Sequence, residues 1–263
     1  MALYALPILY TLFAWWFSTG VILYLNGLPR HTYKWTMGAA TLLLALALVG
    51  LYATRDDTRV TGAFLAFTCA LMVWAWQEVA FLLGYVTGPR RVPCPPGARG
   101  WRRAGFALQT LLHHEAALLA LGAAVVLLTW GGSNMAGPVM FAIFWVMRQS
   151  AKLNVFLGVR NLGENFLPMH LRYLHTYFRR RPMNALFPVS VALSTWLAVL
   201  IWQAATVDGV SPFDATLLTF AGTLLSLAIL EHWFMVLPLP SEALWAWGLR
   251  SRTPVAGELP TKG

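Results

Sequence analysis

Charged residues are scarce in this 263-residue sequence. Only 11% of it is Asp, Glu, Lys or Arg, whereas 58% is hydrophobic and the mean hydropathy is +0.61. A soluble domain of this length would have to expose far more polar surface. The composition therefore excludes an ordinary soluble protein and predicts an all-α, polytopic membrane helical bundle.

Cysteine is scarce as well. Cys69 falls within an apolar stretch and Cys94 within a loop, so the two lie in different layers and a disulfide between them is not expected. The sequence has no C-x-x-C motif and no C-x-x-C-H motif. This argues against a structural zinc site and against covalently attached haem.

Long apolar stretches, by contrast, dominate the chain. A transmembrane helix needs roughly 20 mostly apolar residues. The first stretch lacks a basic n-region and a small-residue cleavage site, so we expect a retained helix rather than a signal peptide. The sequence predicts a single transmembrane domain over residues 1–240 and a cytoplasmic tail over 241–263. Its seven predicted spans are 4–26, 36–54, 60–86, 106–130, 136–158, 185–206 and 212–236.

Basic residues outnumber acidic ones, 19 to 10, and they are unevenly placed. Most of them follow the first, third, fifth and seventh stretches. The positive-inside rule then places the N-terminus in the periplasm and the C-terminus in the cytoplasm. This bias, together with anionic lipid, accounts for the net charge of +9, and no basic, aromatic-rich face for nucleic acid is present.

The longest polar connection joins the fifth and sixth stretches. After Pro168 its apolar and polar residues recur at helical spacing on two separate stripes. The pattern predicts an amphipathic helix over about 168–180 that lies on the cytoplasmic headgroup surface.

Several ionisable residues lie inside the predicted spans. At 1.5 Å per residue they all fall in the cytoplasmic half of the bilayer. An unpaired charge at the centre of a transmembrane helix costs about 2.5–3.5 kcal/mol, so we expect the carboxylates to pair with the two cations across helices. The members of this polar layer are Glu78, His113, His114, Glu115, Arg148, Lys152, Glu231 and His232.

Two interpretations of the polar layer remain open. Its residues are either interhelical ties that fix the packing or a ligand-binding site, with Glu164 and His170 as secondary candidates. Neighbouring residues on a helix point about 100° apart, so His113, His114 and Glu115 cannot all face one centre. The pattern predicts no catalytic residues and leaves the metal, if one is bound, unspecified.

Three longer motifs resemble a known family. The segments FLLGYVTGPRRVPCPPG, SAKLNVFLGVRNLGENFLPMHLRYLHTYFRRRPMNALFPVS and LEHWFMVLPLP together resemble the PuhE family of photosynthetic complex assembly proteins from anoxygenic phototrophs. The resemblance runs from WWFSTG in the first span to LPLP after the seventh. It implies a multi-pass protein of the bacterial inner, or intracytoplasmic, membrane whose partners are photosynthetic complex subunits or assembly proteins.

Three functions are consistent with these features. The first is a non-enzymatic assembly factor for the reaction centre and light-harvesting complex that modulates bacteriochlorophyll supply or binds such a pigment, with His113, His114 and His232 as candidate magnesium ligands. The second is a membrane-embedded metal enzyme acting on a pigment precursor, carotenoid or quinone. Its ligands would be Glu78, Glu115, His114, Glu231 and His232. The third is a proton or small-solute transporter, which the empty outer half of the spans disfavours.

Overall fold

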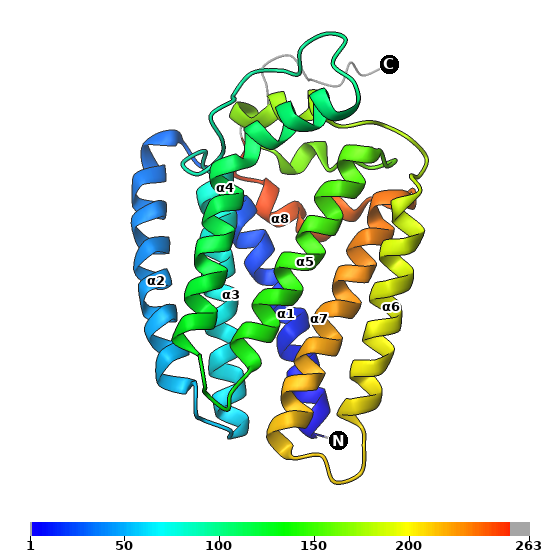
Figure 1. Ribbon diagram of the computed structural model, residues 1–263. Helices are drawn as coiled ribbons and strands as arrows, with labels where there is room; N and C mark the ends of the chain where they lie inside the picture. The colour runs from blue at the N-terminus through cyan, green and yellow to red at the C-terminus, as the bar shows by residue number, and fades with distance from the viewer. Residues whose placement is uncertain (1, 253–263) are drawn as a thin grey trace.

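The computed structural model describes residues 2–252, and seven long helices run side by side within them (Figure 1). No strand occurs among the described residues, so the expected all-helical fold is confirmed. The long helices are α1 (Ala2–Gly27), α2 (Tyr33–Thr54), α3 (Val60–Leu82), α4 (Gly100–Leu128), α5 (Ala136–Leu157), α6 (Leu186–Ala205) and α7 (Pro212–Val236). The short ones are η1 (Arg30–Thr32), η2 (Glu164–Phe166), η3 (Met169–Tyr177), η4 (Ser241–Trp245) and α8 (Ala246–Leu249).

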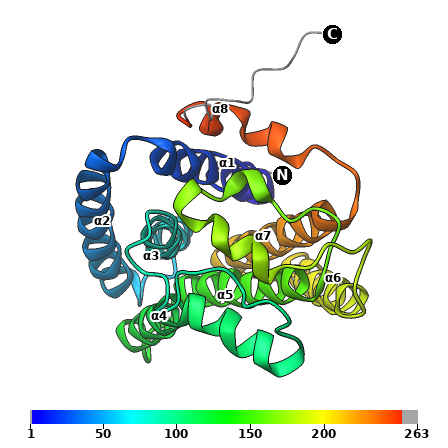
Figure 2. The same cartoon turned by 90° about the horizontal axis from the view of Figure 1, so that it is seen from above.

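Six of the long helices are long and apolar enough to cross a membrane. Helix α5 is not among them, because Arg148, Gln149 and Lys152 lower its hydropathy. It nevertheless packs against α3, α4 and α7 within the bundle (Figure 2). The structure thus supports a multi-pass membrane protein, whereas the count of seven spans and their orientation remain predictions.

Helices α3 and α7 form the centre of the bundle. In each of them 61% of the apolar window is buried, against 22% or less in the other spans. The rings of Phe67 and Phe220 stack with their centroids 4.5 Å apart, and Tyr10 of α1 packs edge-on to both. Small residues on α3, such as Ala63 and Ala70, let neighbouring helices approach closely. This core fills the half of the bundle that lies away from η2 and η3.

Helix α4 is joined to the preceding loop through its own backbone. The His114 N–H donates to the Thr87 carbonyl at 2.9 Å, and the Arg90 N–H donates to the Gln109 carbonyl at 3.3 Å. Gly88 permits this approach, because a Cβ there would lie 2.1 Å from the Gln109 oxygen. Groups that insert into the helical ladder bend helices. The first turns of α4 bend over the end of the bundle toward α5 (Figure 2), and the helix begins six residues before the expected span.

The connection after α5 differs from the expected surface helix. Residues Met169–Tyr177 form a 3₁₀ helix, and the apolar stripe around Leu171 and Leu174 contacts protein instead of facing outward. Leu171 and Leu174 are buried against Phe81 and Leu82 at the end of α3. The predicted apolar stripe is present, but it packs on the bundle and not on a lipid surface.

Residues 241–252, the first part of the predicted tail, pack against α1. The Trp245 indole N–H donates to the Trp16 carbonyl at 3.0 Å, and the Trp16 indole donates to the Leu244 carbonyl at 2.8 Å. Helix α8 lies against α1 at Gly20, where an added Cβ would meet the Trp247 ring at 2.0 Å. The part of the predicted tail after residue 252 lies outside the described residues.

Candidate functional site

A cavity of about 970 Å³ opens between α1, α3, α4, α5 and α7, in the half of the bundle covered by η2, η3 and η4. Its wall is mostly apolar, with a small number of polar side chains. Ligand pockets in proteins have roughly 300–1,000 Å³ and this same mixture of surfaces. Five of the predicted layer residues line it: Glu78, Glu115, Arg148, Lys152 and Glu231.

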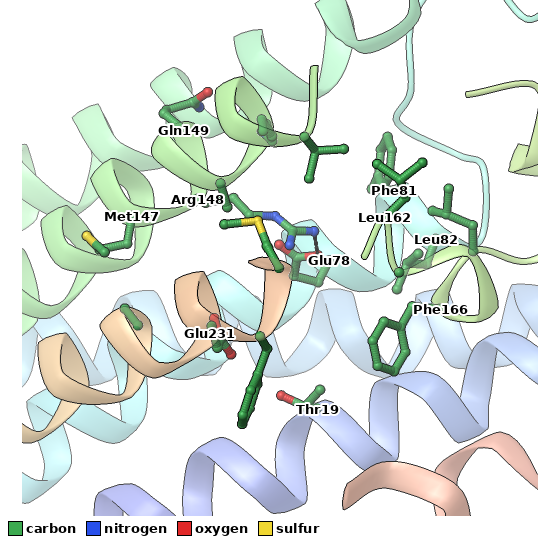
Figure 3. A pocket seen from close by; sticks show the side chains of 18 of the residues that line it. Thr19, Glu78, Phe81, Leu82, Met147, Arg148, Gln149, Leu162, Phe166 and Glu231 are labelled. Atoms are coloured by element: carbon green, nitrogen blue, oxygen red, sulfur yellow. Dashed lines mark hydrogen bonds and ion pairs between the residues drawn. The ribbon is translucent and has the colours of Figure 1, made fainter. Parts of the chain in front are cut away.

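The first polar contact in the cavity joins α3 to α5. The Arg148 guanidinium donates to the Glu78 carboxylate at 2.8 Å (Figure 3). The Glu78 side chain is 12% exposed and that of Arg148 is 41% exposed, so the pair lies at the cavity wall with the arginine facing the open space. Each charge compensates the other at the apolar wall.

The second contact joins α5 to α4. The Lys152 ammonium donates to one oxygen of Glu115 at 2.7 Å, and the Gln149 amide donates to the other at 2.7 Å. Residues 148 and 152 share a helix face because they are four apart. The expected pairing of both cations with carboxylates from other helices is confirmed.

Glu231 of α7 is held differently. One of its oxygens accepts a hydrogen bond from the Trp15 indole N–H at 2.6 Å. Among residues 2–252 no Lys, Arg or His side chain forms an ion pair with it. Its side chain is exposed to the cavity, into which it projects from α7 (Figure 3). Glu231 is therefore a cavity carboxylate that forms no direct ion pair with a protein cation in the described part of the chain.

The histidines of the predicted layer do not face the cavity. His113 is exposed on another side of α4, whereas His114 is buried with its ring 4.7 Å from that of Phe81. The His232 Nδ1–H donates to the Ala228 carbonyl at 2.8 Å, which leaves Nε2 to accept from the Ser150 hydroxyl at 2.8 Å. None of the three lines the cavity. His232 is thus an interhelical tie between α7 and α5.

The candidate ligands of a metal enzyme are also separated. Within residues 2–252 no three His, Cys, Asp or Glu side chains lie close enough together to hold one metal ion. Glu78 and Glu115 face cations, and His232 is saturated by its two hydrogen bonds. The geometry gives no support to a protein-bound metal centre formed by these residues.

Of the two secondary candidates, Glu164 lines the cavity and His170 does not. Glu164 of η2 lines the open end of the cavity and pairs with Arg180 at 2.6 Å. His170 of η3 lies outside the cavity lining, against Gly84 and the Tyr33 ring. Burial, and to a lesser extent the positive charge of Arg30, lower the pKa of His170.

Two residues that complete the cavity, Trp15 and Glu242, were not predicted from the sequence. The Asn165 amide donates to Glu242 at 2.5 Å, which joins η2 to η4 across the open end. Trp15 had no evident partner, although it shares a face of α1 with Thr11 and Ser18. That polar face was the available signal. No pattern in the sequence indicated the contact of Glu242 with Asn165, because 77 residues separate the two.

The chain is similar in sequence to known proteins. Residues 1–256 match a family described as "Protein of unknown function (DUF3623)". The chain belongs to this family. It is also 40% identical over 266 residues to a Rhodobacter capsulatus protein named "Uncharacterized 30.4 kDa protein in puhA 5′region", with 95% of each chain covered. No solved structure matches it.

Proposed function

We propose that this DUF3623 protein is a non-enzymatic membrane assembly factor for the photosynthetic reaction centre and light-harvesting complex, and that it holds a lipophilic pigment in the cavity between its helices. The observation that carries the proposal is the cavity itself. It is at the upper end of the usual size range for ligand pockets, and it combines an apolar wall with a few fixed polar groups.

The context of the relative supports the photosynthetic part of the proposal. The R. capsulatus protein is named for the region 5′ of puhA, a gene of the photosynthetic reaction centre. The PuhE-like motifs in this sequence point to the same process. Photosynthetic complex subunits or assembly proteins are the partners that this role requires.

The position of the cavity within the bundle supports a carrier rather than a transporter. The hollow lies in one half of the bundle, whereas aromatic and small side chains such as Phe213, Phe220 and Ala63 pack the other half. This packing of the described residues disfavours a polar path across the bundle, and a one-sided cavity suits uptake and release of a ligand on one side.

The proposal is tested by purifying the protein from a pigment-producing host and measuring both its pigment content and the cellular level of reaction centre. The variant Ala151→Trp places a large side chain in the cavity wall. We expect wild type to carry pigment and Ala151→Trp to lose it, together with a lower reaction-centre level.

The matched control is Ala116→Trp, because Ala116 is exposed on another side of α4 and does not line the cavity. It should retain the pigment. Wild-type protein free of pigment, in cells that make it normally, would overturn the proposed function.

A further inference from the structure

We propose that Glu231 is the residue that binds the cavity ligand, and that the ligand is a magnesium tetrapyrrole whose metal takes the free oxygen of this carboxylate as its axial ligand. The inference rests on the proposed function and deepens it. It replaces the histidines expected from the sequence with a carboxylate, because those histidines face elsewhere.

The cations of the polar layer already have partners in the cavity. Arg148 and Lys152 are the two cations in the polar layer, and each already pairs with a carboxylate from another helix. Glu231 is the third carboxylate of that layer and has no such pair within residues 2–252. An ionisable group at membrane depth without a partner is a candidate functional group, since its burial is costly. A ligand that accepts an electron pair would stabilise it.

The Glu231 carboxylate is oriented by Trp15. Only Oε1 of Glu231 accepts the Trp15 indole N–H, at 2.6 Å, so Oε2 has no hydrogen-bond partner in the described part of the chain. A hydrogen bond to one oxygen of a ligating carboxylate fixes its direction and tunes its basicity. Trp15 is therefore a positioning residue, and Oε2 is the oxygen presented to the cavity.

The group of the ligand that accepts an electron pair from Glu231 is best supplied by magnesium. Magnesium prefers hard oxygen ligands, and a carboxylate meets that preference. In a magnesium tetrapyrrole the two negative charges of the macrocycle balance the metal. The ligand thus brings a Lewis acid to Glu231 without adding net charge to an apolar cavity.

The wall of the cavity is rich in aromatic side chains. Aromatic side chains from five different parts of the chain line the cavity, and flat conjugated rings pack favourably against them. A simple amine or hydroxyl head group would also satisfy Glu231, but it would leave most of this aromatic surface without a complementary partner. The aromatic lining residues are Trp15, Phe67, Trp74, Phe81, Phe144, Phe156, Phe166, Tyr177, Phe178, Phe234 and Trp245.

The test compares two pigments that differ only at the metal. Full-length protein in detergent is titrated with bacteriochlorophyll a and with its magnesium-free form, bacteriopheophytin a, and binding is followed by absorption and by quenching of tryptophan fluorescence. We expect wild type to bind the magnesium pigment at least about tenfold more tightly, which corresponds to about 1.4 kcal/mol.

Three variants identify the ligand. Glu231→Leu should bind both pigments with equal affinity, whereas Glu231→His, which restores an axial ligand, should recover the preference for magnesium. Trp15→Phe keeps an aromatic ring but loses the N–H, so its preference should fall between the two. Asp208→Asn, in the exposed loop before α7, is the control that should match wild type. Circular dichroism and thermal unfolding of each variant show whether it is folded.

The outcomes separate this inference from the proposed function. Equal binding of both pigments by wild type, or an undiminished magnesium preference in folded Glu231→Leu, would overturn axial ligation and leave the carrier proposal standing. Failure of wild type to bind either pigment would overturn both. Tightly bound phospholipid that neither pigment displaces would show that Glu231 serves a lipid head group, which also contradicts the inference.

Discussion

At the scale of single residues, the direction in which a side chain points from its helix decides its contacts more than its position in the sequence does. His113, His114 and Glu115 are consecutive, yet they have different surroundings. His113 is exposed on one side of α4, His114 is buried against Phe81, and Glu115 binds Lys152 at the cavity wall. The rotation of about 100° per residue produces this separation. A run of polar residues in a transmembrane helix therefore contributes one residue to a given site and sends the others elsewhere.

The Arg148–Glu78 pair leads to a stability prediction. Arg148→Met leaves the Glu78 carboxylate without a cation at membrane depth, and we expect the free energy of unfolding to fall by about 2–3 kcal/mol. The double variant Arg148→Met/Glu78→Gln removes both charges and should recover most of that loss. Unfolding in mixed detergent micelles measures all three proteins.

The control for this pair is Arg172→Met, since Arg172 is an exposed arginine on η3. Its effect should stay within about 0.5 kcal/mol, as for other surface substitutions. A double variant no more stable than Arg148→Met would contradict a direct charge coupling.

At the scale of elements, the segments between and after the spans close the cavity. Helices η2, η3 and η4 lie over its open end, and the Arg252 guanidinium donates to the Asn26 side chain at 3.0 Å and to the Phe166 carbonyl at 2.9 Å. The last described residue is thus bound to both the end of α1 and η2. Local segments of this kind open more easily than the core, because fewer buried contacts hold them.

The contact between α1 and α8 can be broken by one substitution. Gly20→Leu places side-chain atoms where the Trp247 ring now lies, so we expect α8 and η4 to detach from α1. Overpacking of this kind costs about 1–3 kcal/mol. Limited proteolysis should then cleave between residues 237 and 252 faster than in wild type.

Gly38→Leu on α2 is the matched control, because an added Cβ there meets no atom within 4 Å. It should leave the cleavage rate unchanged. Equal protection of residues 237–252 in Gly20→Leu and wild type would show that α8 is held by other contacts.

At the scale of the whole molecule, the bundle is solid in one half and hollow in the other. The loops at the hollow end carry most of the arginines, so the positive-inside rule predicts that this end lies in the cytoplasm. With this predicted orientation, the proposed ligand would enter and leave from the cytoplasmic side.

This orientation is tested with a membrane-impermeant thiol reagent. In a Cys69→Ser background, Cys94 lies in the loop before α4, at the hollow end. Ser133→Cys, in a separate variant that also lacks Cys94, lies in the loop between α4 and α5, at the opposite end. We expect Ser133→Cys to react in intact spheroplasts and Cys94 to react only after permeabilisation. The reverse pattern would invert the orientation and place the cavity on the periplasmic side.

The sequence by itself determined the membrane class, the all-helical fold and the approximate extent of the long helices, because these follow from local hydropathy. It also indicated that Arg148 and Lys152 would pair with carboxylates, since lipid tolerates buried charges only in pairs. Tertiary structure decided which carboxylate serves each cation, that Glu231 meets Trp15 instead, and that the histidines face away from the cavity. These outcomes depend on helix rotation and on contacts between residues 37, 70 and 216 positions apart, which no local pattern encodes.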